Sequence, residues 1–366
     1  MHDVVVIGAG AVGLAIAREL SADRKVLLLD RNDVGQGTSW AAAGMLSPQS
    51  EANADGAFFQ LSMASLRLYR RFVSDLKDET GIDPEYAADG LLLLASSEDE
   101  WKVLQRRCEW QRSADLSAEL IDQDELRRLE PMITMPVAGA LYVPGDHQVV
   151  PRKLVQALSE SCVRRGVEIR TGCKVDEILS ERWLATGVRA GSEVIRVGSI
   201  VAAAGVWTGN IAGMTPGIPL RPRKGQILSL KPPARVFTRM IRWGHTYFVP
   251  RRNGELVIGA TSEDAGFDRS MTPAGLGMLL SEAQQISSHC GEFPIHETWS
   301  GLRPATPDEL PVLGASAIRN LWYAAGHYRN GILLTPITAT IVASLVRGGK
   351  PPLPLDSYSP NRFRIV

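Results

Sequence analysis

The first thirty residues alternate between continuous apolar runs and a glycine-rich turn. The run Val4–Ile7 is short, β-branched and free of polar residues, which predicts a buried strand. Glycines follow at positions 8, 10 and 13, and the apolar spacing of residues 14–20 predicts a helix. A second run, residues 25–29, ends at Asp30. The pattern therefore predicts a strand, a glycine turn, a helix and a second strand, in that order.

This order is the setting that a dinucleotide-binding fingerprint requires. Gly8 permits the tight turn, Gly10 lets backbone N–H groups approach a pyrophosphate, and Gly13 lets the helix pack closely on the strand. The N-terminus of the helix would face the phosphate charge. Asp30 is placed to hydrogen-bond a ribose hydroxyl. The fingerprint alone fits either FAD or NAD.

Beyond residue 30, helical and strand-like spacing alternate. Asn253 and Gly254 separate two strand-like runs and form a strong hairpin signal. The predicted helices are 58–76, 98–112, 151–165, 273–288 and a last one starting near Gly331 and running to 347. The predicted strands are 91–95, 167–170, 174–179, 194–204, 247–250, 255–258 and 321–323.

A strand, a glycine-rich loop and a helix recur at 321–347, so we expect both ends of the chain to build one domain. The fold class is α/β with mixed α+β character: a Rossmann-like dinucleotide-binding domain and a second, antiparallel-sheet substrate domain. A length of 366 residues suits about two domains. The expected ranges are 1–84, 143–219 and 301–366 for the first domain, and 85–142 and 220–300 for the second.

Composition and charge limit the binding partners and the cellular compartment that we expect for this protein. Lys plus Arg and Asp plus Glu both number 40, so nothing favours a nucleic-acid or anionic-membrane partner. The basic residues 221–224 are interpreted as an ordinary loop between strands. The four cysteines form no CxxC pair and the histidines no HxH or HExxH set, so we expect free thiols and no metal. The first strand begins close to Met1 and residues 332–346 are too short and polar to span a bilayer, so we expect a cytoplasmic protein.

Four side chains are candidates for chemistry. Arg303 lies between the apolar residues Leu302 and Pro304. Its guanidinium group could therefore either reach solvent or bind the carboxylate of a substrate. Arg329, expected at the start of the last helix, would oppose the helix macrodipole, which favours a compensating anion. Tyr247 suits a strand core or an active site, and His327 is interpreted as positioned by packing rather than as a base.

Several separate segments match one family, in that family's order. The chain resembles the flavin-dependent amine and D-amino-acid oxidase superfamily, and within it the glycine oxidase family of thiamin biosynthesis. The matching segments are 8–13 with Asp30, 38–39 with 41–45, 204–207, 223–225, 247–251, 259–261, 299–304 and 326–334.

The resemblance implies FAD, bound non-covalently, and a substrate domain that roofs the flavin. It assigns catalytic roles to Tyr247, Arg303 and Arg329, with residues 326–333 facing the isoalloxazine. The cofactor-binding residues that it implies are Gly8, Gly10, Ala11, Val12, Gly13, Asp30, Arg31, Thr38, Ser39, Ala43, Gly44, Met45, Val175, Gly205, Gly326, His327, Tyr328, Arg329, Asn330, Gly331, Ile332 and Leu333.

The activity that the resemblance implies is the oxidative deamination of glycine, by hydride transfer to flavin N5. Reoxidation by O₂ would then give H₂O₂, with imine or glyoxylate and ammonia as products. Backbone donors at the expected helix start near Gly331 would stabilise negative charge on the flavin. Ser262 stands where the family has a second methionine, and Ser47-Pro48 is bulkier than the small residues expected there. Sarcosine and small D-amino acids therefore stay open as substrates.

Four other functions stay open on the sequence. The first is a dehydrogenase of D-amino or N-methyl amino acids that passes electrons to an acceptor other than O₂. The others are the flavin module of a tRNA-modifying enzyme, a non-catalytic dinucleotide sensor and an NAD-dependent dehydrogenase. Zero net charge argues against the tRNA enzyme, and a sensor has no reason to keep both Arg303 and Arg329. A dimer or tetramer is left open.

Overall fold

The structure is a computed structural model that describes residues 2–52 and 54–363. A six-stranded sheet in the order β18-β19-β12-β1-β2-β8 draws strands from both ends of the chain, as expected. Its neighbouring strands are parallel except for the pair β18 and β19. The strands are β1 Val4–Ile7, β2 Val26–Leu29, β8 Glu168–Arg170, β12 Ser199–Ala202, β18 Val312–Ala315 and β19 Leu321–Ala325.

Both faces of this sheet are covered, which explains the uninterrupted apolar run of β1. Val4 and Val6 pack in a core with the helices, whereas Val5 and Ile7 pack on the opposite face. The helices on the first face are α1 Ala11–Leu20, α4 Ala57–Thr80, α7 Pro151–Arg164 and α9 Thr335–Val346. A three-stranded sheet covers the second face with β9 Glu177–Glu181, β10 Leu184–Ala190 and β11 Glu193–Arg196.

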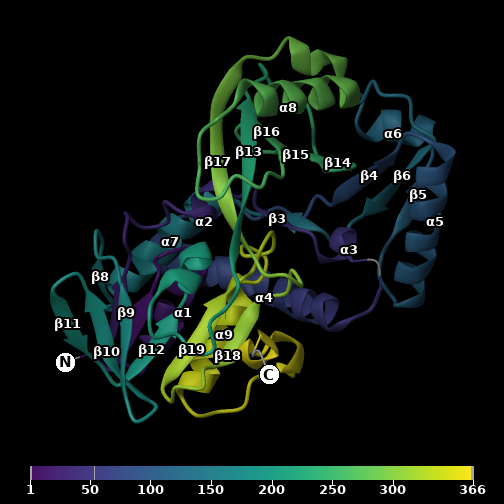
Figure 1. Ribbon diagram of the computed structural model, residues 1–366. Helices are drawn as coiled ribbons and strands as arrows, with labels where there is room; N and C mark the ends of the chain where they lie inside the picture. The colour runs from purple at the N-terminus through teal and green to yellow at the C-terminus, as the bar shows by residue number, and fades with distance from the viewer. Residues whose placement is uncertain (1, 53, 364–366) are drawn as a thin grey trace.

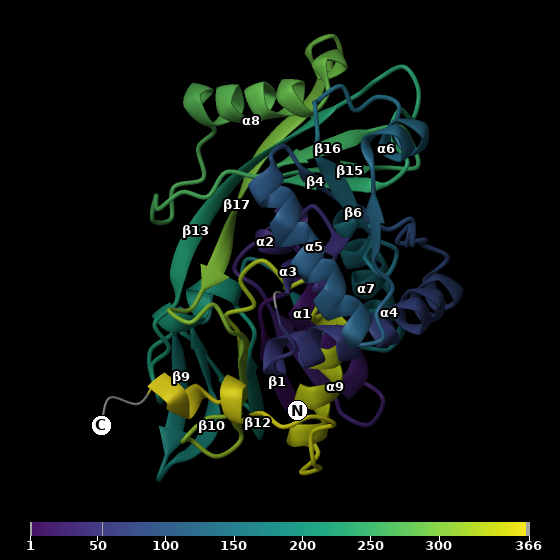
Figure 2. The same ribbon diagram turned by 90° about the vertical axis from the view of Figure 1, so that its right-hand side faces the viewer.

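A second, eight-stranded sheet has the order β17-β13-β16-β15-β14-β4-β6-β5 and is antiparallel apart from the junction of β14 with β4. Figures 1 and 2 show it above the first sheet, with the long strands β13 and β17 reaching down between them. Its strands are β4 Leu91–Ala95, β5 Glu119–Ile121, β6 Gly139–Val143, β13 Arg221–Leu230, β14 Met240–Trp243, β15 Thr246–Pro250, β16 Leu256–Gly259 and β17 Ile295–Ala305.

Helices flank this second sheet, and short elements connect the two sheets. Helix α8 (Pro273–Ile286) packs through Leu279, Ala283 and Ile286 on the core of one face. The remaining elements are α2 Thr38–Ala41, β3 Met45–Leu46, α3 Pro48–Glu51, α5 Glu98–Ser113, α6 Gln123–Leu129, β7 His147–Gln148, η1 Gly205–Asn210, η2 Ser288–Gly291, η3 Asp356–Tyr358 and η4 Pro360–Phe363. No helix among the described residues combines the length and the apolar character needed to cross a bilayer.

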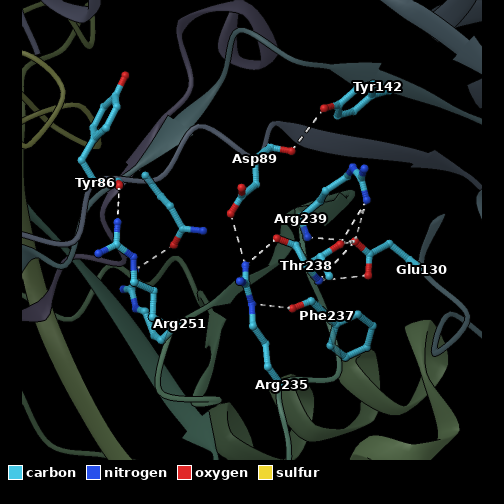
Figure 3. Close-up of polar contacts among 11 residues, drawn as sticks. Tyr86, Asp89, Glu130, Tyr142, Arg235, Phe237, Thr238, Arg239 and Arg251 are labelled. Carbon is cyan, nitrogen blue, oxygen red and sulfur yellow. Dashed lines mark hydrogen bonds and ion pairs between the residues drawn. The ribbon is translucent and has the colours of Figure 1, made fainter. Parts of the chain in front are cut away.

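A buried carboxylate fixes the loop that leads into β14 (Figure 3). Glu130, 1% exposed, accepts hydrogen bonds from the backbone N–H of Thr238 and of Arg239, the latter at 2.8 Å. Arg235 in the same loop pairs with Asp89, just before β4. These contacts set β14 beside β4 and so place the side chains of β14.

Three sequence-based expectations about strands and loops are wrong. The strand expected at 174–179 begins only at Glu177. The chain before it is held elsewhere, because the Cys173 N–H donates a hydrogen bond to the Asp30 carbonyl. The run 194–204 is two strands, β11 and β12, that belong to different sheets. Residues 221–224 form the start of β13 rather than a loop, and Lys224 there is 1% exposed.

The last helix begins at Thr335, four residues later than expected. Residues 328–334 before it form two turns joined at Asn330. Arg329 therefore lies outside the first turn of the helix, where the macrodipole acts. The expected domain boundaries stay a prediction.

Candidate active site

A continuous cavity of about 1440 Å³ lies between the two sheets. Its walls include the carboxyl ends of β1 and β2, where open α/β sheets bind ligands, and the facing side chains of the second sheet. Ile7 and Leu29 line one wall, and Ile227, Tyr247 and Arg303 line the other. Gly8 and Gly10 of the glycine turn and residues 327–332 all line this one cavity.

The glycine turn fits a pyrophosphate because there is no room in it for side chains. Gly8 has φ +108°, and a Cβ there would lie 2.4 Å from the Ala203 carbonyl oxygen. A Cβ on Gly13 would lie 1.8 Å from the Gly8 carbonyl oxygen, so α1 can pack on the turn only with glycine there. Gly8 and Gly10 line the cavity, and Gly13 supports the turn from behind.

The side chains of Asp30 and Ser39 accept hydrogen bonds from the backbone of this turn. Asp30 accepts hydrogen bonds from Ala9 N–H at 2.6 Å and Asn32 N–H at 2.8 Å, and burial raises the pKa of its carboxyl group. The Ser39 hydroxyl accepts the Ala11 N–H at 2.9 Å. Both side chains line the cavity, so the residues present fit the dinucleotide end of FAD.

Aromatic side chains border the cavity beyond Asp30. The Arg31 guanidinium lies 5.1 Å from the ring centre of Trp207, and Trp207 stacks on Phe267 with ring centres 6.1 Å apart. Phe267 belongs to the loop after β16, so the second sheet contributes to this end of the cavity as well.

The register of the second sheet places one row of side chains on the cavity face. Arg242 pairs with Tyr247, Tyr247 with Gly259, and Gly259 with Ile227. The Tyr247 hydroxyl lies over Gly259, 2.4 Å from where a Cβ would be. One strand further, the Arg303 guanidinium lies over Gly225 in the same way, 1.9 Å from a Cβ position. Two glycines thus make room for the two candidate substrate-binding side chains.

Arg303 keeps part of its guanidinium open to the cavity. Its Nη2 donates to the Thr261 carbonyl at 2.6 Å. Within the described part of the chain, no carboxylate lies at ion-pair distance from it, whereas Arg329 and Arg242 nearby both pair with Glu51. A partly buried arginine without an acidic partner fits an anionic ligand.

Arg329 has a different counter-ion from the one expected. Its Nη2 lies 3.6 Å from Glu51, which also accepts from Arg242 Nη1 at 2.7 Å. The anion that compensates the charge of Arg329 is therefore a carboxylate of this chain, and the helix macrodipole does not act on Arg329. All three residues line the cavity, and Glu51 links the cofactor side of the cavity to the second sheet.

Two neutral groups complete this end of the cavity. Burial raises the pKa of Tyr247, so its hydroxyl stays protonated and can donate. Burial lowers the pKa of His327 to about 4, and its Nε2 lies 3.1 Å from the Thr338 hydroxyl. His327 is therefore neutral near pH 7 and held by packing.

Most of the sequence-predicted site residues meet at this cavity. Tyr247, Arg303 and Arg329 line it, as do all the predicted cofactor residues apart from Ala11, Gly13, Gly326 and Leu333. Sequence reasoning missed Glu51, Arg242, His245 and Trp207 as lining residues. Only the pairing of Arg242 with Tyr247 could have revealed Arg242, and that pairing requires knowing β14.

A buried carboxylate holds the α3 segment that carries Glu51. Asp146 is fully buried and accepts hydrogen bonds from Gln49 N–H at 3.2 Å, from Ser50 N–H at 3.1 Å and from the Ser50 hydroxyl. Burial raises its pKa to about 7, and the hydrogen bonds oppose this only in part. The native state therefore binds this proton more tightly than the unfolded chain does.

The Asp146 proton predicts a pH-dependent stability. The contribution of the Asp146 carboxyl group to the free energy of unfolding is fully present below its unfolded pKa, near 3.8. This contribution is lost as the pH rises through the folded pKa, about 7. Between pH 5 and 8 the loss is about 3 kcal/mol. Buried, neutral His327 changes the stability in the opposite direction over this range, so the loss is measured as a difference: from pH 5 to pH 8, the free energy of unfolding of the wild type in urea should fall by about 3 kcal/mol relative to that of Asp146→Asn. Asp99→Asn, at a side chain 95% exposed, is the control and should behave as the wild type.

Comparison with known proteins places this architecture in a family. The family model "FAD dependent oxidoreductase" matches residues 3–345. The chain is 33% identical to the glycine oxidase of Geobacillus kaustophilus, over 99% of this chain and 97% of the relative. A crystal structure of glycine oxidase from that organism superposes with a TM-score of 0.95 at 31% identity, covering 100% of this chain and 99% of the other.

A cyanobacterial relative extends beyond this chain. The "bifunctional protein ThiO/ThiG" of Nostoc is 37% identical over 94% of this chain, but the match covers 52% of the relative, so the chain spans about half its length. The family match agrees with the glycine turn, the cavity and the paired sheets. The chain belongs to the FAD dependent oxidoreductase family, and it is an enzyme with FAD as its cofactor.

Proposed function

We propose that this enzyme is an oxidase that deaminates glycine or a comparably small amino acid and passes the electrons to O₂. The observation that carries the proposal is Arg303, a cavity arginine with no acidic partner among the residues that the structure describes, which lines the same cavity as the protonated Tyr247 hydroxyl. The names of the relatives that cover the whole chain support glycine as the substrate.

The cofactor would lie along the predicted residues, with its dinucleotide end on Gly8, Gly10 and Asp30 and its ring near 327–332. FAD supplies the two-electron oxidation when bound. Positioning is what the chain's own residues contribute. The free edge of Arg303 would hold the substrate carboxylate and Tyr247 would donate a hydrogen bond to it, so that the Cα–H faces the ring. Neutral His327 and the Arg329–Glu51 pair would shape the opposite wall.

The departures from the family pattern bear on the size of the substrate. Ser262 and Ser47 both line the cavity, and Glu51 and Arg242 lie at the same end. These polar groups favour a small polar substrate over one with an apolar side chain. We therefore rank glycine first, with sarcosine and small D-amino acids behind it.

The visible spectrum of the purified protein tests this proposal. Glycine added without oxygen should bleach the flavin absorption, and air should restore it with release of H₂O₂. D-Alanine and sarcosine serve as comparison substrates and should act more slowly. A yellow protein that ignores all three would exclude the proposed substrate class, and bleaching reversed by a quinone but not by air would exclude the oxidase.

A further inference from the structure

A buried lysine beside the cavity has no part in the proposed function. Lys224 is 1% exposed and does not line the cavity. Its ammonium group lies 3.4 Å from Glu263 and 3.6 Å from Asp268. A buried charge is costly unless it is paired, so this arrangement has a structural or functional reason.

Glu263 is the carboxylate of this group that also contacts Gln226 and Thr261. One carboxylate oxygen faces Lys224, and the other accepts the Gln226 side-chain amide at 2.8 Å and the Thr261 hydroxyl. The Thr261 hydroxyl in turn accepts Gln226 N–H at 2.8 Å. Asp268 has none of these contacts, and its side chain is 54% exposed.

The same segment is tied to β13 through its backbone. Lys224 and Glu263 exchange both backbone hydrogen bonds, at 3.0 and 2.9 Å, and Thr261 N–H donates to the Gln226 carbonyl at 3.2 Å. Residues 261–263 are therefore fixed against 224–226 by side-chain and backbone bonds together.

This fixed segment presents the acceptor that orients Arg303. The Thr261 carbonyl accepts a hydrogen bond from Arg303 Nη2 at 2.6 Å. The guanidinium group of Arg303 lies over Gly225, the residue between Lys224 and Gln226 in the sequence. An arginine side chain has many rotamers, and a carboxylate is bound in the bidentate way only if the planar fork is correctly turned. With one arm held by Thr261, the other edge is left for a ligand.

We propose that Glu263, kept in place by buried Lys224, is a positioning residue for Arg303. It fixes the Thr261 carbonyl, which fixes the guanidinium that binds the substrate carboxylate. The proposal rests on the proposed function in one respect, namely that Arg303 is the carboxylate anchor. Glu263 acts through Thr261 and touches neither substrate nor cofactor.

The test compares Glu263→Ala with Asp268→Ala in the FAD-loaded enzyme. Both variants remove one carboxylate from Lys224, but only the first removes the contact to Thr261. We expect Glu263→Ala to raise the KM for glycine and the Kd for acetate by about tenfold, as loss of roughly one hydrogen bond's worth of orientation would do. Acetate, a carboxylate without an amine, is titrated by its effect on the flavin spectrum. Asp268→Ala should change neither value more than about twofold.

A purely structural role gives a different result. In that case Glu263→Ala lowers the melting temperature and the FAD content, but the loaded fraction keeps wild-type KM and acetate affinity, which overturns the proposal. If Glu263→Ala does not fold, Thr261→Val removes the hydroxyl link to Glu263, together with the acceptor of the Gln226 N–H, and keeps the Thr261 carbonyl. This variant should raise the KM for glycine and the Kd for acetate about threefold, which corresponds to roughly half of the free energy of one hydrogen bond. Unchanged values would overturn the proposal.

Failure of the proposed function is distinguishable from failure of this inference. If Arg303→Ala itself leaves KM and acetate Kd unchanged, the anchor assignment is wrong and the inference falls with it. If Arg303→Ala weakens both while Glu263→Ala matches Asp268→Ala, only the role of Glu263 is wrong.

Discussion

Replacing Arg303 with alanine is expected to raise the KM for glycine about a hundredfold while FAD stays bound. Hydrogen bonds to charged groups contribute about 1.5–3 kcal/mol each, so the lower limit for the two bonds of a bidentate pair, about 3 kcal/mol, corresponds to about a hundredfold. Glycine has no side chain to supply other contacts, so its binding depends heavily on its carboxylate. The residues predicted to hold the dinucleotide lie on other elements, so the flavin spectrum and FAD content should be those of the wild type.

The chain offers a matched control for this change. Arg223 lies directly opposite Arg303 in the pairing of β13 with β17, and its partner is Asp264 at 3.6 Å, a side chain 75% exposed. Arg223→Ala removes the same side chain one strand away and should leave KM within about twofold, since exposed ion pairs contribute little. Arg303→Lys, which keeps the charge and loses the fork, should lie between the two. Equal KM values for the two alanine variants would show that Arg303 is not the anchor.

Local patterns in the sequence were enough for the cofactor end of the fold. Val4–Ile7, the glycine turn and α1 follow one another directly, so periodicity and glycine spacing specify them without knowledge of the rest of the chain. The return of the chain end to the same sheet was also predictable, because a strand, a glycine loop and a helix recur around β19 and α9.

The substrate end could not be read in this way because it depends on pairings between distant segments. Arg242 reaches the cavity face only because β14 pairs with β15, and its position beside β4 depends on the contacts of Glu130. The sequence predicts an ordinary loop around Lys224, since nothing near Lys224 in the sequence shows that Glu263 pairs with it. The sequence predicts a helix start near Gly331 because apolar residues follow it directly, whereas the helix begins only at Thr335 and leaves Arg329 outside it.

Gly13→Ala is expected to abolish FAD retention, since the added methyl group would meet backbone that cannot move without opening the site. Its Cβ would lie 1.8 Å from the Gly8 carbonyl oxygen and 3.6 Å from the Ala203 side chain. Gly8 is itself confined at φ +108°, with a Cβ position 2.4 Å from the Ala203 carbonyl oxygen, so the turn cannot retreat toward β12. Helix α1 must shift outward instead, which moves its first N–H groups away from the pyrophosphate position and costs about 1–3 kcal/mol or more of packing.

The measurement for Gly13→Ala is FAD content after purification, followed by titration of the variant with FAD and by its melting temperature. Gly277→Ala in α8 is the control, because a Cβ there meets nothing within 4 Å. It should bind FAD normally and gain up to about 1 kcal/mol of stability, as alanine favours a helix interior over glycine. A folded Gly13→Ala protein that binds FAD as tightly as the wild type would show that α1 does not need its close approach to the turn. The third glycine of the fingerprint would then act only in packing, and the cofactor would depend on the turn at Gly8 and Gly10 alone.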